Sequence, residues 1–439
     1  MQKGQILERM EEEIASISIV NSHEHIRPAE SVRAREVDLW DFFANSYVNA
    51  DFISAGFPGW VREGYSDPEV GWEEGSYDPE AAWKDIREWL PRVRNTAYFR
   101  GLMLAFRELF DFPTTQELDD SNWRELNEKL NAANKRPDWY AYVLKEWANT
   151  ATAIWDGGRQ TFFERDHLHP DRGFFVPVLR IDDFVEAQQV SQRTRIEEKY
   201  GARAHTLDDY LDLLDMAFQE VLEVGGVGIK SGSAYRRIIH YAKVPRAQAE
   251  RVFSLHSDDI GAADAKAFQD FMMHEVLKRC AEYGLPMQIH TGLQAGNGNV
   301  LSNSNPLHLT NLLLEYGDVK FDLFHGSYPF TGELAVLAKT FPNVYLNACW
   351  LSFICPSENK RALHEWIETV PGSKILAWGG DCRRVEATYG SLLLARPLIA
   401  EVLAEKVEAG YFGLEVALEL AHRMLRDNGA ELFGLDLEG

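Results

Sequence analysis

The chain is poor in cysteine, short of basic residues and free of long apolar runs. Its four cysteines among 439 residues form no Cys-x-x-Cys pair, which excludes a disulfide scaffold and fits a reducing compartment. Lys and Arg total 45 against 68 Asp and Glu, and the net charge of −23 disfavours nucleic acid and anionic lipid as partners. No apolar run approaches the roughly 20 residues of a membrane span, and the acidic N-terminus lacks a signal-peptide pattern. We expect a cytoplasmic protein with no membrane or nucleic-acid partner.

What the chain does have is an alternation of short apolar runs and amphipathic segments. With 45% hydrophobic and 12% aromatic residues it can bury a large core. Apolar strand, helix, apolar strand is typical of parallel βα units whose sheet is covered on both faces. The runs expected to form strands cover residues 16–25, 151–157, 174–181, 224–231, 285–292, 319–326, 343–350 and 373–381. Eight such units predict the α/β class and a (β/α)₈ TIM barrel.

Residues 30–148 interrupt this alternation. The segment is rich in Trp, Asp and Glu at first and then shows helical patterns such as TAYFRGLMLAFRELF. Its many aromatic residues argue against a flexible linker. We expect a helical, Trp-rich insertion after the first strand, folded over the barrel mouth, within a single domain spanning 1–439.

The first strand ends in Asn-Ser-His-Glu-His. His23 and His25 are two residues apart, so on an extended chain both side chains project to the same side, with Glu24 turned the other way. Two imidazoles on one side can bind one divalent ion. Surface or capping histidines would give the same motif, so the motif alone leaves both interpretations open.

Other strand ends carry the same kind of residue. His290, His325 and Asp381 end the expected fifth, sixth and eighth strands. Burying unpaired imidazoles and carboxylates costs several kcal/mol, and one shared cation satisfies them together. We therefore expect a divalent metal, with zinc preferred and manganese or iron still open. The remaining nine histidines lie in helical or polar segments and are assigned no role.

Basic and aromatic residues follow the fourth strand. Lys230 ends the run Gly-Ile-Lys-Ser, and Tyr235, Arg236 and Arg237 come directly after it. In so acidic a chain, these cations favour local capture of a small anionic substrate. The substrate-binding candidates are Lys230, Tyr235, Arg236 and Arg27. A carbamylated Lys230 bridging two metals and a structural ion pair remain alternatives.

Taken in order, the His-x-His, Lys, His, His and Asp strand ends resemble the amidohydrolase superfamily, from residue 16 to the C-terminus. Gly-Ile-Lys-Ser-x-x-Ala-Tyr-Arg-Arg and the run at His325 are similar to its amidohydrolase-related group. The helical segment, including WLPRVRNTAYFRGLMLAFRELFDF, looks more like uronate isomerase. The chain departs from that enzyme in GGDCRRVEATYG after the eighth strand and in having His325.

The resemblance implies a barrel of the metal-dependent hydrolase type and a role for each residue. His23, His25, His290 and Asp381 would bind the metal, with Asp381 also acting as general base. His325 would polarise the substrate carbonyl or stabilise an oxyanion. The implied function is a metal-dependent hydrolase acting on a small carboxylated substrate. Uronate isomerase and non-oxidative decarboxylase are the alternatives, and assembly into a homo-oligomer stays open.

Overall fold

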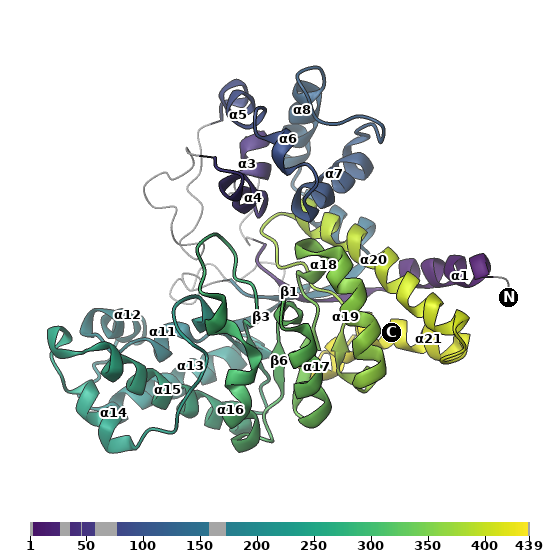
Figure 1. The fold of residues 1–439 in the computed structure, drawn as a ribbon. Helices are drawn as coiled ribbons and strands as arrows, with labels where there is room; N and C mark the ends of the chain where they lie inside the picture. The colour runs from purple at the N-terminus through teal and green to yellow at the C-terminus, as the bar shows by residue number, and fades with distance from the viewer. Residues whose placement is uncertain (1–2, 27–35, 45, 58–76, 158–172, 438–439) are drawn as a thin grey trace.

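The computed structural model describes residues 3–26, 36–44, 46–57, 77–157 and 173–437, and its core is one sheet of eight parallel strands (Figure 1). The strands follow one another around the sheet in chain order, β1 to β8. They are β1 Ile19–Glu24, β2 Thr150–Trp155, β3 Phe175–Arg180, β4 Gly228–Ser231, β5 Met287–Ile289, β6 Phe321–Leu323, β7 Val344–Asn347 and β8 Ile375–Leu376. Seven lie inside runs expected from the sequence, and β2 begins one residue before its run, so the (β/α)₈ fold class is confirmed.

The strands are short and almost wholly buried because helices cover the outer face of the sheet. The longest covering helices carry explicit start and stop signals. Helix α13 begins at Thr206, whose side chain accepts the Asp209 N–H in a capping box. Helix α15 ends at Gly284 in the left-handed conformation that glycine favours.

The helices outside the sheet are α1 Lys3–Ser16, α11 Asp182–Val185, α12 Val190–Tyr200, α13 Leu207–Glu223, α14 Arg246–Phe253, α15 Ala262–Tyr283, α16 Thr310–Glu315, α17 Thr331–Thr340, α18 Leu351–Ile354, α19 Pro356–Thr369, α20 Val385–Glu408, α21 Leu414–His422 and α22 Asn428–Phe433. Single 3₁₀ turns, η3 Ser233–Tyr235 and η7 His325–Ser327, follow β4 and β6 directly. Those two turns place functional side chains at the carboxyl ends of the strands.

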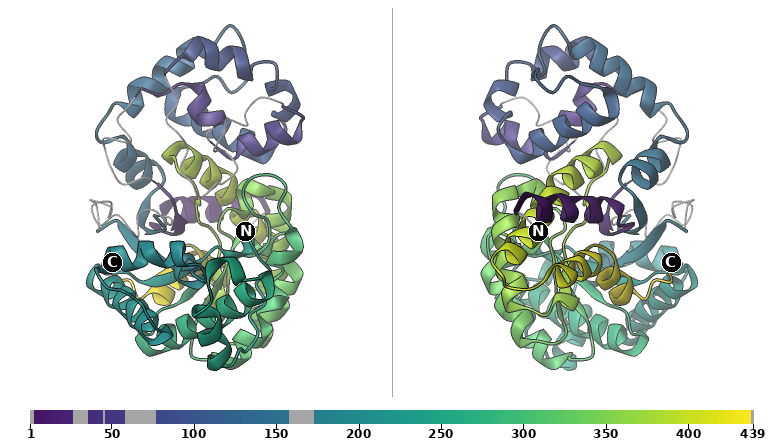
Figure 2. Two further views of the ribbon diagram at one scale, coloured as in Figure 1. Left: turned by 90° about the vertical axis from the view of Figure 1, so that its left-hand side faces the viewer. Right: turned by 90° about the vertical axis from the view of Figure 1, so that its right-hand side faces the viewer.

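Between β1 and β2 the chain forms a separate group of helices above the barrel (Figure 2). They are α3 Leu39–Phe43, α4 Val48–Ser54, α5 Pro79–Ile86, α6 Leu90–Val93, α7 Ala97–Phe110, α8 Trp123–Asn134, α9 Trp139–Ala141 and the π-helix η1 Tyr142–Trp147. Two buried contacts tie this helical group to α20 and the loop before it. Arg384 donates to Asp41, and the Trp139 indole donates to Glu386 at 2.7 Å. That the whole chain folds as one domain stays a prediction.

Helices α7 and α20 pack through glycines. A Cβ atom at Gly390 would lie 2.3 Å from the carbonyl oxygen of Gly101, so only hydrogen fits between the helices there. Helix α20 is long and apolar enough to cross a membrane by length and composition, but 67% of that window is buried inside the protein. Its apolar character therefore serves the contact with α7 and the barrel core.

We predict that Gly390→Ala lowers the free energy of unfolding by about 1–3 kcal/mol, because the added methyl group forces apart two helices already in backbone contact. Urea denaturation measures this change. Gly4→Ala is the control, because Gly4 lies in α1 with no heavy atom within 4 Å of the added Cβ, and we expect no loss of stability there. An unchanged midpoint for Gly390→Ala would show that α7 and α20 are not closely packed.

Candidate metal centre

Side chains from the two ends of the sheet converge at the carboxyl side of the barrel. His23 and His25 come from the end of β1, and Asp381 follows β8. The Nε2 atoms of the two histidines lie 3.3 Å apart, and Asp381 Oδ1 lies 3.1 Å from His25 Nε2 and 3.5 Å from His23 Nε2. The alternation of an extended chain puts both imidazoles on one side, as the sequence predicts.

Burial, hydrogen bonds and nearby charges set the protonation of the two rings. The Nδ1–H of His25 donates to the Asp156 carbonyl at 2.8 Å, so Nε2 is the atom that faces His23 and Asp381. Burial lowers the pKa of His25, but the Asp381 hydrogen bond and the Asp156 charge outweigh it, so the net direction is upward and a metal ion would replace the proton at Nε2. His23 is fully buried, its Nδ1 has no partner among the described residues, and burial together with Lys230 lowers its pKa well below the ordinary value. A neutral imidazole is the form that binds a metal. Because each Zn–N bond is about 2.1 Å long, both Nε2 atoms can reach one ion.

The third ligand atom belongs to a carboxylate that stays ionised. Burial raises the pKa of Asp381, but the hydrogen bond from His25 and the positive charges of His25 and Lys230 outweigh it, so the net direction is downward. Asp381 has a φ of 52°, in the left-handed region that costs a non-glycine residue about 1–2 kcal/mol. Such strain is typical of functional positions, where the surrounding structure holds a side chain in place.

His290 and His325 form a second pair beside this trio. His325 Nδ1–H faces the Cys349 carbonyl at 3.1 Å and His290 Nε2–H faces the Leu293 carbonyl at 2.9 Å. Their remaining nitrogens, His325 Nε2 and His290 Nδ1, therefore both present lone pairs across 3.0 Å. Only a proton or a cation between them makes that contact favourable.

Of the two rings, His325 was expected to donate a hydrogen bond to an oxyanion. Burial lowers the pKa of His325 to about 4, so the ring is neutral and its Nε2 accepts rather than donates. This protonation state does not support the expected donation. His325, Cys349 and Asp381 form a further group whose ligand atoms lie within 4.8 Å of one another. Metal binding by His290 stays a prediction, since that side chain contacts His325 rather than the His23, His25 and Asp381 trio.

Lys230 reaches the same region from β4. It is 2% exposed, and its Nζ lies 3.4 Å from the centre of the Phe324 ring. Among the described residues it has no hydrogen-bond or ion-pair partner. Burial and the Arg180 charge lower its pKa to about 8. A buried ammonium without a counter-ion is costly, so an incoming anion would stabilise it.

Two of the other substrate-binding candidates, Tyr235 and Arg236, lie in or beside η3 after β4. The Tyr235 ring stands over His290 with centroids 4.7 Å apart, and its hydroxyl accepts the Ala295 N–H at 3.0 Å. Arg236 already forms an ion pair with Glu186 at 2.5 Å, which neutralises its charge. Arg27 lies outside the described residues. Substrate binding by these three side chains stays a prediction.

Sequence reasoning missed Tyr47, which comes from the helical group. Its hydroxyl donates to the Asp381 carbonyl at 2.5 Å and lies 3.2 Å from Asp381 Oδ2. Its ring packs on Trp350, with centroids 4.5 Å apart, and Trp350 in turn contacts His325. No motif marks Tyr47, because it lies 334 residues from its partner.

Asp156 and Arg180 were also missed, although each stands at a strand end. Arg180 Nη1 donates to Asp156 Oδ2 at 2.9 Å, and Arg180 also pairs with Asp182. Asp156 Oδ2 lies 3.9 Å from His23 Nε2. The rule that identified His290 and Asp381, a polar residue ending an apolar strand, would have identified both.

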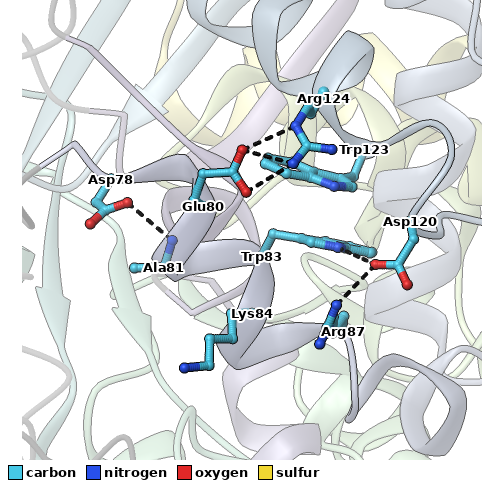
Figure 3. A pocket seen from close by; sticks show the side chains of 9 residues that line it. All are labelled: Asp78, Glu80, Ala81, Trp83, Lys84, Arg87, Asp120, Trp123 and Arg124. Atoms are coloured by element: carbon cyan, nitrogen blue, oxygen red, sulfur yellow. Dashed lines mark hydrogen bonds and ion pairs between the residues drawn. The ribbon is translucent and has the colours of Figure 1, made fainter.

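A cavity of about 540 Å³ opens elsewhere, in the helical group between α5 and the start of α8 (Figure 3). Trp83 and Trp123 stack there with centroids 5.5 Å apart, so each ring covers a face of the other. Most of its charged groups are paired: Arg124 with Glu80, and both Arg87 and the Trp83 indole with Asp120. Lys84 also lines the cavity.

Comparison with known proteins agrees with the fold and with the family that the sequence resembles. The sequence model of the amidohydrolase family matches residues 155–435. Protein fluG of Emericella nidulans is 30% identical over 227 residues, which cover 48% of this chain and 26% of fluG. The chain therefore spans about a quarter of the length of that relative.

Uronate isomerases match over more of the chain. The uronate isomerase of Phenylobacterium zucineum is 25% identical over 382 residues, covering 79% of this chain and 75% of the relative. The crystal structure of glucuronate isomerase from Caulobacter crescentus superposes with a TM-score of 0.76 at 20% identity, covering 100% of this chain and 95% of that one. The superposition shows a shared fold that includes the helical group.

We predict that His23→Ala abolishes binding of one equivalent of divalent metal per chain, because it removes one of two nitrogens that must share the ion. Metal analysis after equilibrium dialysis measures this. His274→Ala is the matched control: His274 is buried and contacts the Tyr316 hydroxyl at 2.8 Å in another part of the barrel. Retention of the full metal content by His23→Ala would remove the trio as a metal site.

Proposed function

Because this chain belongs to the amidohydrolase family, we propose that it is a divalent-metal-dependent enzyme whose reaction is aldose–ketose isomerisation of a uronic acid. The observation that carries this proposal is the Tyr47 hydroxyl beside the Asp381 carboxylate, at the edge of the metal trio. An acid and a base held side by side can move a proton between neighbouring atoms of one substrate.

The relatives support isomerisation over the hydrolysis that the sequence favours. The Phenylobacterium zucineum protein is named a uronate isomerase and matches 79% of this chain. Among the comparisons, hydrolysis is supported only by the family that the chain matches. The chain departs from uronate isomerases around Asp381, but it retains Arg383 two residues later, as in the Asp-Ser-Arg-Ser run of that enzyme.

His23, His25 and Asp381 Oδ1 are the atoms that would hold the ion, which polarises a substrate carbonyl when bound. Zinc, manganese and iron all suit two nitrogens and an oxygen. Asp381 Oδ2 faces away from the histidine pair toward Tyr47 and His325, the latter at 4.0 Å. This oxygen can take the proton from the carbon next to the carbonyl and return it to the carbonyl carbon.

Tyr47 complements this base. Burial and the Asp381 charge raise the pKa of its hydroxyl well above the ordinary value, so it keeps its proton at neutral pH. The protonated hydroxyl holds Asp381 in place by donating its one proton to the Asp381 carbonyl, and donation to a substrate oxygen that gains charge would replace that bond. The helical group thus contributes directly to the chemistry.

Lys230 supplies the preference for an acid. Among the described residues its ammonium group has no hydrogen-bond or ion-pair partner, and a substrate carboxylate would provide one in a buried setting where charge pairing is strong. Uronic acids carry both a carboxylate, which would pair with Lys230, and a hydroxy-carbonyl group, which would bind at the metal trio.

Hydrolysis of a small carboxylated substrate is the second candidate. It is favoured by the His290–His325 pair, a departure from uronate isomerases, and by Asp381, which can equally accept a proton from water. Cytoplasmic location and oligomeric state stay predictions.

We predict that the metal-loaded protein converts D-glucuronate or D-galacturonate to the ketose and exchanges the C2 proton with solvent. NMR in D₂O measures both. Asp381→Asn should lower kcat by at least about a hundredfold, because an amide cannot accept the proton. No turnover of either sugar acid, with hydrolysis of carboxylated amides instead, would replace the isomerase by the second candidate.

We predict that Lys230→Met raises KM for the sugar acid about tenfold or more with a smaller change in kcat, because it removes the cation that pairs with the carboxylate. Steady-state kinetics measures both constants. Lys374→Met is the control: Lys374 is also buried with a pKa lowered to about 8, but it binds the Phe341 carbonyl below the barrel site. If instead Lys230→Met loses metal with KM unchanged, Lys230 is a metal bridge.

A further inference from the structure

The barrel has a seam between its last and first strands. Ladders join every neighbouring pair from β1 to β8, but among the described residues no ladder pairs β8 with β1. The metal trio straddles this seam, because the histidines follow β1 and Asp381 follows β8. Two backbone bonds cross it there: the Asp381 N–H donates to the His23 carbonyl at 2.9 Å, and the His25 N–H donates to the Cys382 carbonyl at 3.1 Å.

Glu24, between the two histidines, adds a side-chain link across the same seam. It is fully buried, and its carboxylate points away from the imidazoles. Oε1 accepts the Cys382 N–H at 2.5 Å, and Oε2 accepts the Thr388 hydroxyl at 2.8 Å. Oε2 also accepts the Asn21 amide at 2.8 Å, so both oxygens are occupied.

These contacts are made to the residues on either side of Asp381 in the chain. Cys382 follows Asp381 directly, and Gly380 precedes it. A Cβ atom at Gly380 would lie 2.2 Å from Glu24 Oε2, so the glycine lets the carboxylate approach the chain closely. The Gly380 N–H donates to Asn21 Oδ1 at 2.9 Å, and that same Asn21 binds Glu24.

We propose that Glu24 is a positioning residue: by binding the backbone after Asp381, it sets the distance between the Asp381 carboxylate and the histidine pair across the β8–β1 seam. The strain at Asp381 makes such a contact necessary, because a non-glycine residue with φ of 52° relaxes unless neighbouring bonds hold it. Hydrogen bonds that orient metal ligands typically change metal affinity or activity by about 10–100-fold.

Glu24→Gln tests this directly. The glutamine side chain has the same size, but one of its two terminal groups is an NH₂ donor. That donor must face either the Cys382 N–H or the Thr388 and Asn21 donors, so at least one hydrogen bond across the seam is lost. We expect the dissociation constant for Zn²⁺ or Mn²⁺, measured by calorimetry without substrate, to rise about 10–100-fold. With a substrate in hand, kcat should fall more than KM changes.

Glu386→Gln is the matched control. Glu386 is a buried carboxylate near the start of the same helix, and it accepts the Trp139 indole N–H at 2.7 Å, away from Asp381. The melting temperature of Glu386→Gln should fall by about as much as that of Glu24→Gln, while its metal affinity should equal that of the unaltered protein. Equal metal affinity in Glu24→Gln and the unaltered protein, with a lower melting temperature, would reduce Glu24 to a structural residue and overturn the proposal.

Gly380→Ala disturbs the same contact by placing a methyl group against the Glu24 carboxylate, which itself stays unchanged. This substitution should weaken metal binding in the unaltered protein. It should weaken metal binding less in a Glu24→Ala variant, where the carboxylate is absent. Additive effects of the two changes would contradict the proposal, and this holds even where Glu24→Gln does not fold. Because metal affinity is measured without substrate, failure to isomerise uronic acids leaves this test unaffected.

Discussion

The mouth of this barrel is organised around two imidazole nitrogens and a carboxylate oxygen that face one another in a buried space. His23 and His25 direct Nε2 atoms toward each other at 3.3 Å, with Asp381 Oδ1 at 3.1 and 3.5 Å from them. His23 is neutral and buried, its Nδ1 has no partner among the described residues, and His25 Nε2 and the ionised Asp381 face its Nε2. A divalent cation would bind all three groups together.

Other features of the site follow from that requirement. The ligands come from opposite ends of the chain, so the sheet must close at the β8–β1 seam, where Glu24 and two backbone bonds replace a strand ladder. Asp381, His325 and Trp350 all have positive φ values just after a strand, which turns their side chains into the mouth. The helical group then covers this end of the barrel and brings Tyr47 to Asp381.

Much of the fold could be predicted because eight buried parallel strands leave a strong apolar pattern. The polar residues that end those strands stand out against it, so His23, His25, His325 and Asp381 were identifiable. Asp156 and Arg180 obey the same rule and could have been identified. Tyr47 could not, because it lies directly before helix α4, in a segment whose aromatic residues are explained by packing alone. Tautomers also lie beyond sequence: the contact of His325 Nδ1 with the Cys349 carbonyl directs its Nε2 toward His290, and the role expected of His325 stays a prediction.

Anomalous diffraction from crystals grown with zinc or manganese, with data on both sides of the metal absorption edge, tests the central claim most directly. The account predicts one strong peak within bonding distance of His23 Nε2, His25 Nε2 and Asp381 Oδ1. A peak at any other place, or none there at saturating metal, would contradict it.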